Sequence, residues 1–311
     1  MLLTHGASAT QLPPVALTVG NFDGIHRGHQ ALLARLLAGA RTRGLKSCVL
    51  TFEPHPREFF AGQAAPTRLA SLREKLELLA AHGVERTHVQ RFDRAFASLA
   101  PESFVEEVLA KRLRARWVLI GEDFRFGARR AGDIGLLRDL GRRHGCEVEV
   151  LADVAHAGMR VSSSAVRAAL AAGNLGAAET LLGRPYSISG RVVHGRRLGR
   201  ELGFATANVQ LKHNRPPLSG IFAVRVHGAG AGPRPAVASL GVRPTITASG
   251  RAVLEVHLFD FSQDLYGAHM RVEFLHKIRD EEKYSDLSAL KAQIERDCEA
   301  ARAFLLESRN A

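Results

Sequence analysis

The chain has 311 residues, of which 46% are hydrophobic and 24% charged, a composition typical of a globular protein long enough for two domains. It contains no apolar run of the roughly 18 residues that a membrane span needs, and we expect neither a signal peptide nor a membrane partner. Its three cysteines lack paired spacing, which argues against disulfides or a zinc site and favours a cytoplasmic location. The net charge of +12 suits an anionic ligand, but the arginines are scattered and aromatic residues make up only 6%, so we expect no nucleic-acid partner.

The first half of the chain alternates strand-like and helical segments. Apolar runs predict strands over 15–20, 47–52, 87–92, 117–121 and 148–151, and helical periodicity falls over 30–43, 72–82, 102–113 and 133–144. Alternation with short links predicts an α/β domain with a Rossmann-like parallel sheet covered on both faces. The carboxyl ends of its strands meet at one edge, where such sheets bind ligands.

The turn after the first predicted strand carries the clearest chemical signal. It contains the pattern His-x-Gly-His at His26 and His29, between a strand and a helix. Free backbone N–H groups at a helix N-terminus bind phosphate, and glycines let a ligand approach closely. An ordinary loop is the competing interpretation, but the context predicts a nucleotide site for nucleotidyl transfer, with further groups in the same turn: Gly20, Asn21, Phe22, Asp23 and Gly24.

Two further turns should lie at the same edge of the sheet, over 51–56 and over 121–127, the second of which contains Asp123. Serines at 162–164 open another helical pattern, where they either cap the helix or bind phosphate together with Arg167. A short helix over 174–182 is broken by Gly183-Arg184-Pro185. We therefore place a domain boundary there, giving domains 1–184 and 185–311.

The second half loses helical periodicity. Short β-like runs cover 187–194, 204–209, 220–226, 234–240, 253–261 and 270–278, with Gly and Pro between them. Several strands at this spacing predict a small β-barrel or sandwich. Apolar residues from Leu287 to Leu305 then recur every three or four positions, which predicts one long helix packed on the β domain.

This half also carries residues suited to phosphate chemistry. The segment 195–208 is rich in Gly and Arg, and Thr206 and Asn208 would face the same side of a strand, which suits a shared Mg²⁺–phosphate contact. Glu255 lies inside an apolar strand, where it is either exposed at an edge or a base in a cavity. The chain has no Gly-Lys dipeptide, so any kinase here does not use a P-loop.

These motifs together resemble the bacterial bifunctional riboflavin kinase/FAD synthetase family. In the first half they are GNFDGIHRGHQ (20–30), TFEPHP (51–56), RFD (91–93), PESF (101–104), GEDFRFG (121–127) and SSSAVR (162–167). In the second half they are GRELGF (199–204), TAN (206–208), SGIFAV (219–224), LGVRPT (240–245), EVHLFDF (255–261), DLYG (264–267), IR (278–279) and EKY (282–284). The resemblance runs from about Val15 to Asp297 in the order of the family.

The resemblance implies two transferase reactions. The C-terminal β-barrel would phosphorylate riboflavin from ATP to FMN, with flavins as substrate and product. The N-terminal domain would transfer AMP from ATP to FMN, giving FAD and pyrophosphate. It further implies that His26 and His29 stabilise charge on the phosphates, and that Glu255 is the kinase base.

The remaining site residues also follow from the resemblance. The turn residues 20–24 would line the adenylyl site with Asp123, Ser163 and Arg167 nearby. The kinase ATP and flavin site would include Gly195, Gly199, Arg200, Thr206 and Asn208, with Thr206 and Asn208 holding Mg²⁺. Ala205 stands where the family usually has proline, which should loosen the backbone before Thr206.

Two alternatives remain at this stage. One is a single-activity HxGH nucleotidyltransferase with an unrelated C-terminal module. The other is a basic nucleic-acid-binding protein with an inactive nucleotidyltransferase fold. The expected partners of the favoured interpretation are the small molecules riboflavin, FMN and ATP, and the oligomeric state is left open.

Overall fold

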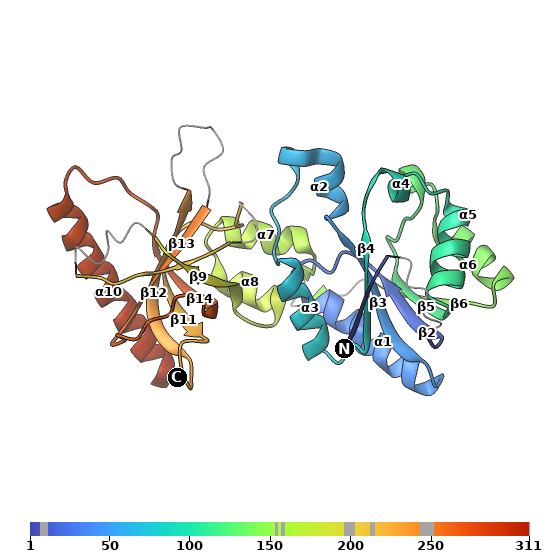
Figure 1. The fold of residues 1–311 in the computed structure, drawn as a ribbon, viewed down its shortest axis with the longest axis horizontal. Coiled ribbons are helices and arrows are strands. Elements are labelled where there is room, and N and C mark those ends of the chain that lie inside the picture. Colours follow the sequence, from blue (N-terminus) through green and yellow to red (C-terminus); the bar gives the residue numbers. More distant parts are fainter. Residues whose placement is uncertain are drawn as a thin grey trace. The chain divides into compact units, whose positions relative to one another are not determined.

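The computed structural model describes residues 1–6, 12–152, 155–156, 159–195, 203–211, 215–242 and 252–310 (Figure 1). The chain forms two compact units. The first comprises Met1–Pro66 and Leu72–Ser162, and the second comprises Thr67–Ser71 and Ser163–Ala311. The domain boundary expected at residue 184 stays a prediction.

A six-stranded parallel sheet forms the centre of the first unit. Its order is β1-β4-β3-β2-β5-β6, and every neighbouring pair is parallel, as predicted. The strands are β1 (Leu2–His5), β2 (Val15–Val19), β3 (Lys46–Glu53), β4 (Arg86–Arg91), β5 (Ala115–Gly121) and β6 (Glu147–Leu151). The edge strand β1 was not among the predicted elements. A separate two-stranded hairpin pairs β7 (Ala155–His156) with β8 (Met159–Arg160).

Helices cover both faces of this sheet. They are α1 (Arg27–Thr42), α2 (Pro56–Ala61), η1 (Gly62–Ala64), α3 (Leu72–Ala81), α4 (Arg94–Ala97), α5 (Pro101–Ser103), η2 (Phe104–Arg112), η3 (Ala128–Arg130) and α6 (Ile134–Arg143). The helix predicted over 102–113 is instead a single turn, α5, followed by the π-helical segment η2.

Alternating side chains of the strands divide the core of this unit into two layers. Val15 and Leu17 of β2 pack on the face covered by η2 and α6. Ala16 faces the opposite layer, where α1 and α3 pack around the fully buried Trp117. This arrangement follows from the period of two along a strand, and it leaves the turn after β2 at the carboxyl edge of the sheet.

Strand β4 is an exception to the apolar character of the central strands. Arg86, Thr87, His88 and Gln90 are all buried. The edge strand β1 satisfies part of this polarity, because Thr4 Oγ1 lies 2.9 Å from His88 Nδ1. His88 Nε2 has no hydrogen-bond partner among the described residues. Burial, with a smaller contribution from Arg112 and Arg86, lowers the pKa of His88 to about 4.

We expect His88→Leu to flatten the acid sensitivity of the first unit. An unfolded histidine has a pKa of about 6.5, so stability from the neutral ring is complete above that pH and falls as the pH approaches 4. The loss is on the order of 3 kcal/mol. Unfolding can be followed in urea titrations by the fluorescence of Trp117, the single tryptophan. As the pH falls from 6.5 to 4.5, the free energy of unfolding of the variant should rise relative to that of the wild type. An equal change of stability with pH in the two proteins would contradict the assignment, and the half-buried His144→Leu serves as control.

The second unit contains a closed barrel, in agreement with the prediction. Its strand order is β10-β13-β12-β11-β14-β9. The elements are α7 (Ser163–Ala171), α8 (Leu175–Leu182), β9 (Tyr186–Val193), β10 (Ala207–Val209), β11 (Gly220–His227), β12 (Arg234–Val242), β13 (Ala252–Leu258), β14 (His269–Arg279) and α10 (Leu287–Asn310). The long helix α10 packs its apolar stripe, including Ala301 and Leu305, on Ala223 and Val237 of the barrel wall. In the described part of the chain, no helix is both long and apolar enough to cross a membrane.

Candidate active sites

His26 and His29 form a stacked pair at the start of α1. His26 is the N-cap of this helix, with extended backbone angles, and its Nδ1 accepts a hydrogen bond from the backbone N–H of His29 at 3.3 Å. The two rings stack with centroids 3.7 Å apart and planes 18° from parallel. Capping therefore fixes both imidazoles at the first turn of α1.

The turn that precedes the histidines is held in an unusual conformation. Phe22, Gly24 and Ile25 have φ angles of 49°, 83° and 41°. Such angles in residues other than glycine cost about 1–3 kcal/mol each and persist only where the surroundings enforce them. Phe22 and Ile25 are fully buried, and Gln30 Nε2 donates to Ile25 O at 2.9 Å. The turn is therefore rigid before any ligand arrives.

The site contains polar atoms that are buried without a protein partner. Asn21 Oδ1 and His29 Nδ1 have no hydrogen-bond partner among the described residues. Burial, together with nearby His26 and Lys75, holds the pKa of His29 well below its ordinary value of 6.5. His29 is thus a neutral ring at physiological pH, and such a ring can donate a hydrogen bond to an anion.

Lys75 of α3 is a member of this site that the sequence analysis missed. It is only 3% exposed, and its Nζ donates to Thr51 Oγ1 at 3.3 Å. Thr51 Oγ1 in turn donates to the carbonyl of Asn21 at 3.2 Å. A signal was present, because Lys75 lies four positions before the buried Leu79 and therefore on the apolar face of the helix.

The other adenylyl-site candidates lie on other elements of the chain. Asp123 is exposed in the turn that follows β5, at the carboxyl edge of the sheet. Ser163 is the first residue of α7 and Arg167 lies further along it, within the second unit. Arg167 Nε donates to the carbonyl of Thr67 in that unit. The contribution of these three residues to the adenylyl site stays a prediction.

In the barrel, Asn208 and Glu255 are direct cross-strand neighbours. The antiparallel register of β10 and β13 places them opposite one another. Both are half-buried, whereas the residues directly before and after each along the chain are buried. Residues directly opposite share one face of the sheet, with Cβ atoms about 5 Å apart. The amide and the carboxylate therefore meet on the same face, and Thr206, two positions before Asn208, is also half-buried.

Glu281 is a second carboxylate at this place, and the sequence analysis did not identify it. Its side chain occupies the space that a Cβ at Gly241 of β12 would fill. Burial raises the pKa of Glu281, Arg279 counteracts this, and the negative charge of Glu255 raises it further. Arg279 is itself oriented by an ion pair with Asp297 of α10 at 2.6 Å.

The segment around Asn208 is closely fitted. A Cβ at Gly195 would overlap the amide group of Asn208, so glycine is needed there for Asn208 to keep its position. His257 Nδ1 lies 2.8 Å from the carbonyl of Ala205. This contact anchors the backbone at the position where the family usually has proline. The candidates Gly199 and Arg200 lie outside the described residues.

Protein-family models match both parts of the chain. The model described as FAD synthetase matches residues 8–165, and the one described as riboflavin kinase matches residues 182–305. The first contains the stacked histidines, and the second contains the Asn208–Glu255 pair. The chain is thus a two-part transferase of flavin nucleotide synthesis, and the second match excludes the single-activity alternative.

Curated proteins named bifunctional riboflavin kinase/FMN adenylyltransferase match nearly the whole chain. The one from Escherichia coli (strain K12) is 49% identical over 96% of both chains. That from Pseudomonas fluorescens is 47% identical over 94% of this chain and 93% of its own, and that from Haemophilus influenzae is 45% identical over 96% and 97%. The chain belongs to the bifunctional riboflavin kinase/FMN adenylyltransferase family.

A solved structure also resembles this chain. It is named as the crystal structure of a macrolide-efflux protein from Streptococcus pneumoniae, with a TM-score of 0.83 and 30% sequence identity. The likeness covers 97% of this chain and 99% of that one. The comparison extends the fold to a protein whose printed name points to a different activity.

Proposed function

We propose that His26 and His29 hold the triphosphate of ATP while AMP is transferred to FMN. The observation that carries this proposal is the stacked pair of imidazoles at the N-terminus of α1. Donors that are fixed before reaction and directed at developing negative charge are usually the largest contribution to catalysis. Attack by the terminal phosphate of FMN on the α-phosphorus forms the new P–O–P bond and expels pyrophosphate. Neighbouring Gly20, Phe22, Asp23 and Gly24 would line the nucleotide, and Asp123 would contribute from the turn after β5.

Lys75 would strengthen the same site electrostatically. The hydroxyl group of Thr51 links its buried ammonium to the turn that precedes the histidines. A cation close to His29 favours the neutral ring and adds positive potential where pyrophosphate leaves. Lys75 is therefore a positioning residue for the adenylyl transfer.

At the barrel, Glu255 would act as the general base for riboflavin. Its carboxylate would accept the proton of the ribityl 5′-hydroxyl as that oxygen attacks the γ-phosphorus of ATP, and ADP would leave. Kinase chemistry needs little beyond positioning and charge stabilisation. Gly195, Gly199 and Arg200 would contact ATP or flavin, and Glu281 would keep the local negative charge high.

Mg²⁺ would enter the kinase site with ATP, held by Thr206 and Asn208. Hydroxyl and amide oxygens are hard ligands of the kind this ion accepts. Among the described residues no group of three or more His, Cys, Asp and Glu could hold a metal, which fits an ion that takes most of its ligands from phosphates and water. The ion supplies charge neutralisation on the phosphates. The expected setting is the cytoplasm, with riboflavin, FMN and ATP as the only partners needed.

An HPLC time course with riboflavin, ATP and MgCl₂ tests the whole proposal. FMN should appear first and FAD later, because the product of one site is the substrate of the other. Replacing MgCl₂ with EDTA should abolish both products. Accumulation of FMN without FAD, also when FMN is added directly, would contradict adenylyl transfer by the first unit.

Gly195→Ala should lower riboflavin phosphorylation about tenfold or more while leaving FAD formation from added FMN unchanged. The new methyl group displaces the Asn208 amide, and misplacing a positioning group costs a large factor in rate. Gly232→Ala is a matched control, because nothing lies within 4 Å of a Cβ there. Equal kinase activity in the two variants would argue against a role for Asn208.

A further inference from the structure

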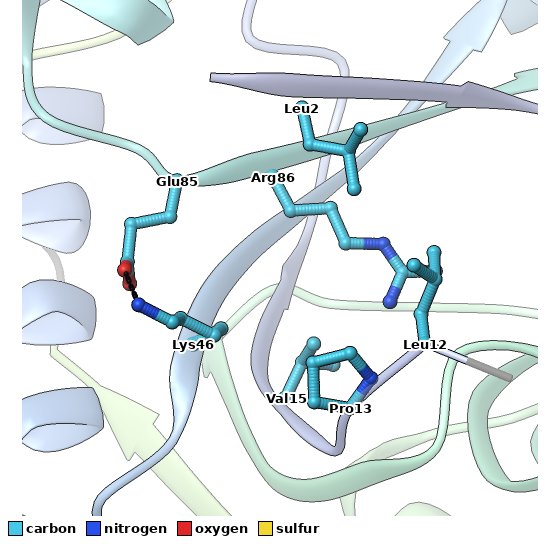
Figure 2. Close-up of a pocket in the computed structure, with 7 residues that line it drawn as sticks. All are labelled: Leu2, Leu12, Pro13, Val15, Lys46, Glu85 and Arg86. Carbon is cyan, nitrogen blue, oxygen red and sulfur yellow. Dashed lines mark hydrogen bonds and ion pairs between the residues drawn. The ribbon is translucent and has the colours of Figure 1, made fainter.

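A cavity lies at the opposite end of the sheet from the HxGH turn. It has a volume of about 310 Å³ and is lined by Leu2, Leu12, Pro13, Val15, Lys46, Glu85 and Arg86 (Figure 2). Val15, Lys46 and Arg86 are the first residues of β2, β3 and β4, whereas His26 follows the end of β2. The adenylyl chemistry described above makes no use of this cavity.

Arg86 places a buried cation in this cavity. The residue is 5% exposed, and neither Nε nor Nη1 has a hydrogen-bond partner among the described residues. Figure 2 shows its side chain extending toward Leu12, away from Glu85 and Lys46. A buried guanidinium without partners is costly, and such groups are normally paired.

The neighbouring groups do not supply the missing negative charge. Glu85 is already bonded to Lys46 Nζ at 2.7 Å and to the backbone N–H of Ser47 at 2.9 Å. Burial raises the pKa of the Cys48 thiol to about 12 despite the attraction of Arg86, so this group is neutral. No carboxylate of the described residues therefore pairs with Arg86, and an anion in the pocket would supply the missing charge.

The walls of the cavity indicate what kind of anion fits. Leu2, Leu12, Pro13 and Val15 are apolar, and the volume is about ten times the roughly 30 Å³ that one water molecule occupies. A dianionic phosphate would need more donors than a single guanidinium provides. We propose that this cavity is a binding site for a small amphiphilic carboxylate, with its carboxylate on Arg86 and its apolar body against Leu2, Leu12 and Val15.

Hexanoate is a suitable probe, with 1-hexanol and inorganic phosphate as comparisons. Thermal unfolding of the full chain is followed by Trp117 fluorescence, and binding by calorimetry. Hexanoate should raise the unfolding temperature by about 5 °C at roughly 100 times its Kd. The increase should vanish in Arg86→Met and persist in Arg116→Met, an exposed arginine on β5. Without probe, Arg86→Met should unfold at the same temperature as the wild type or higher, because a buried unpaired charge has been removed.

The other outcomes would overturn the proposal. Equal stabilisation of the wild type and Arg86→Met would place hexanoate elsewhere on the protein. If 1-hexanol stabilised as well as hexanoate, the carboxylate would not be recognised. If phosphate stabilised the protein as much as hexanoate does, the apolar walls would have no part in binding. No shift and no heat of binding at millimolar hexanoate would show that the cavity takes no such ligand.

Discussion

His29→Ala is expected to reduce FAD formation from FMN and ATP by about 100- to 1,000-fold, while FMN formation from riboflavin stays within about twofold of the wild type. The ring is a fixed neutral donor, stacked on His26 and buried. Its removal takes away stabilisation that is needed only as pyrophosphate departs. The measurement is the initial rate of each half-reaction, with FMN supplied directly for the second.

Two variants separate chemistry from structure in this test. His29→Asn keeps a donor at part of the ring's position and should retain more activity than His29→Ala. His144→Ala, at the C-cap of α6, should leave both activities unchanged. A parallel loss of FMN and FAD formation in His29→Ala would mean that the variant is misfolded or that the two sites are not independent.

Glu255→Gln should have the opposite effect, lowering riboflavin phosphorylation by about 100- to 10,000-fold and sparing FAD formation from added FMN. Glutamine keeps the shape and the cross-strand position opposite Asn208 but accepts a proton far less readily. The loss should appear in kcat more than in KM, since proton transfer belongs to the chemical step.

Glu281→Gln provides the sharpest comparison for this second experiment. Glu281 is electrostatically coupled to Glu255, so its neutralisation should shift the pH dependence of kcat without abolishing turnover. Glu295→Gln on the exposed side of α10 should change nothing. If Glu281→Gln were inactive and Glu255→Gln active, the assignment of the base would be reversed.

The sequence analysis predicted the elements that depend on local periodicity. The five strands after β1, the barrel strands and helix α10 all appear within a few residues of their expected positions. Periodicity suffices there because one face of each element is buried against the core. The segment 102–113 was harder, because α-helical and π-helical turns share nearly the same apolar pattern.

What the sequence analysis missed depends on contacts between distant segments. Strand β1 is only four residues long, and it is recognisable only beside β4. Lys75 and Glu281 are ordinary charged residues in the sequence, and their burial beside a catalytic candidate arises from tertiary packing. The buried His88 of β4 is accommodated because the neighbouring strand supplies Thr4. No local propensity carries such information.

Strand β1 also bears on how the protein is made. It pairs with β4 alone, and its contact between Thr4 and His88 spans 84 positions of the chain. Domains form progressively during synthesis, but β1 has no strand to join until β4 has left the ribosome. Since Leu2 and Arg86 are partners in the same ladder, β1 would add to the sheet only after the segments between them have been made.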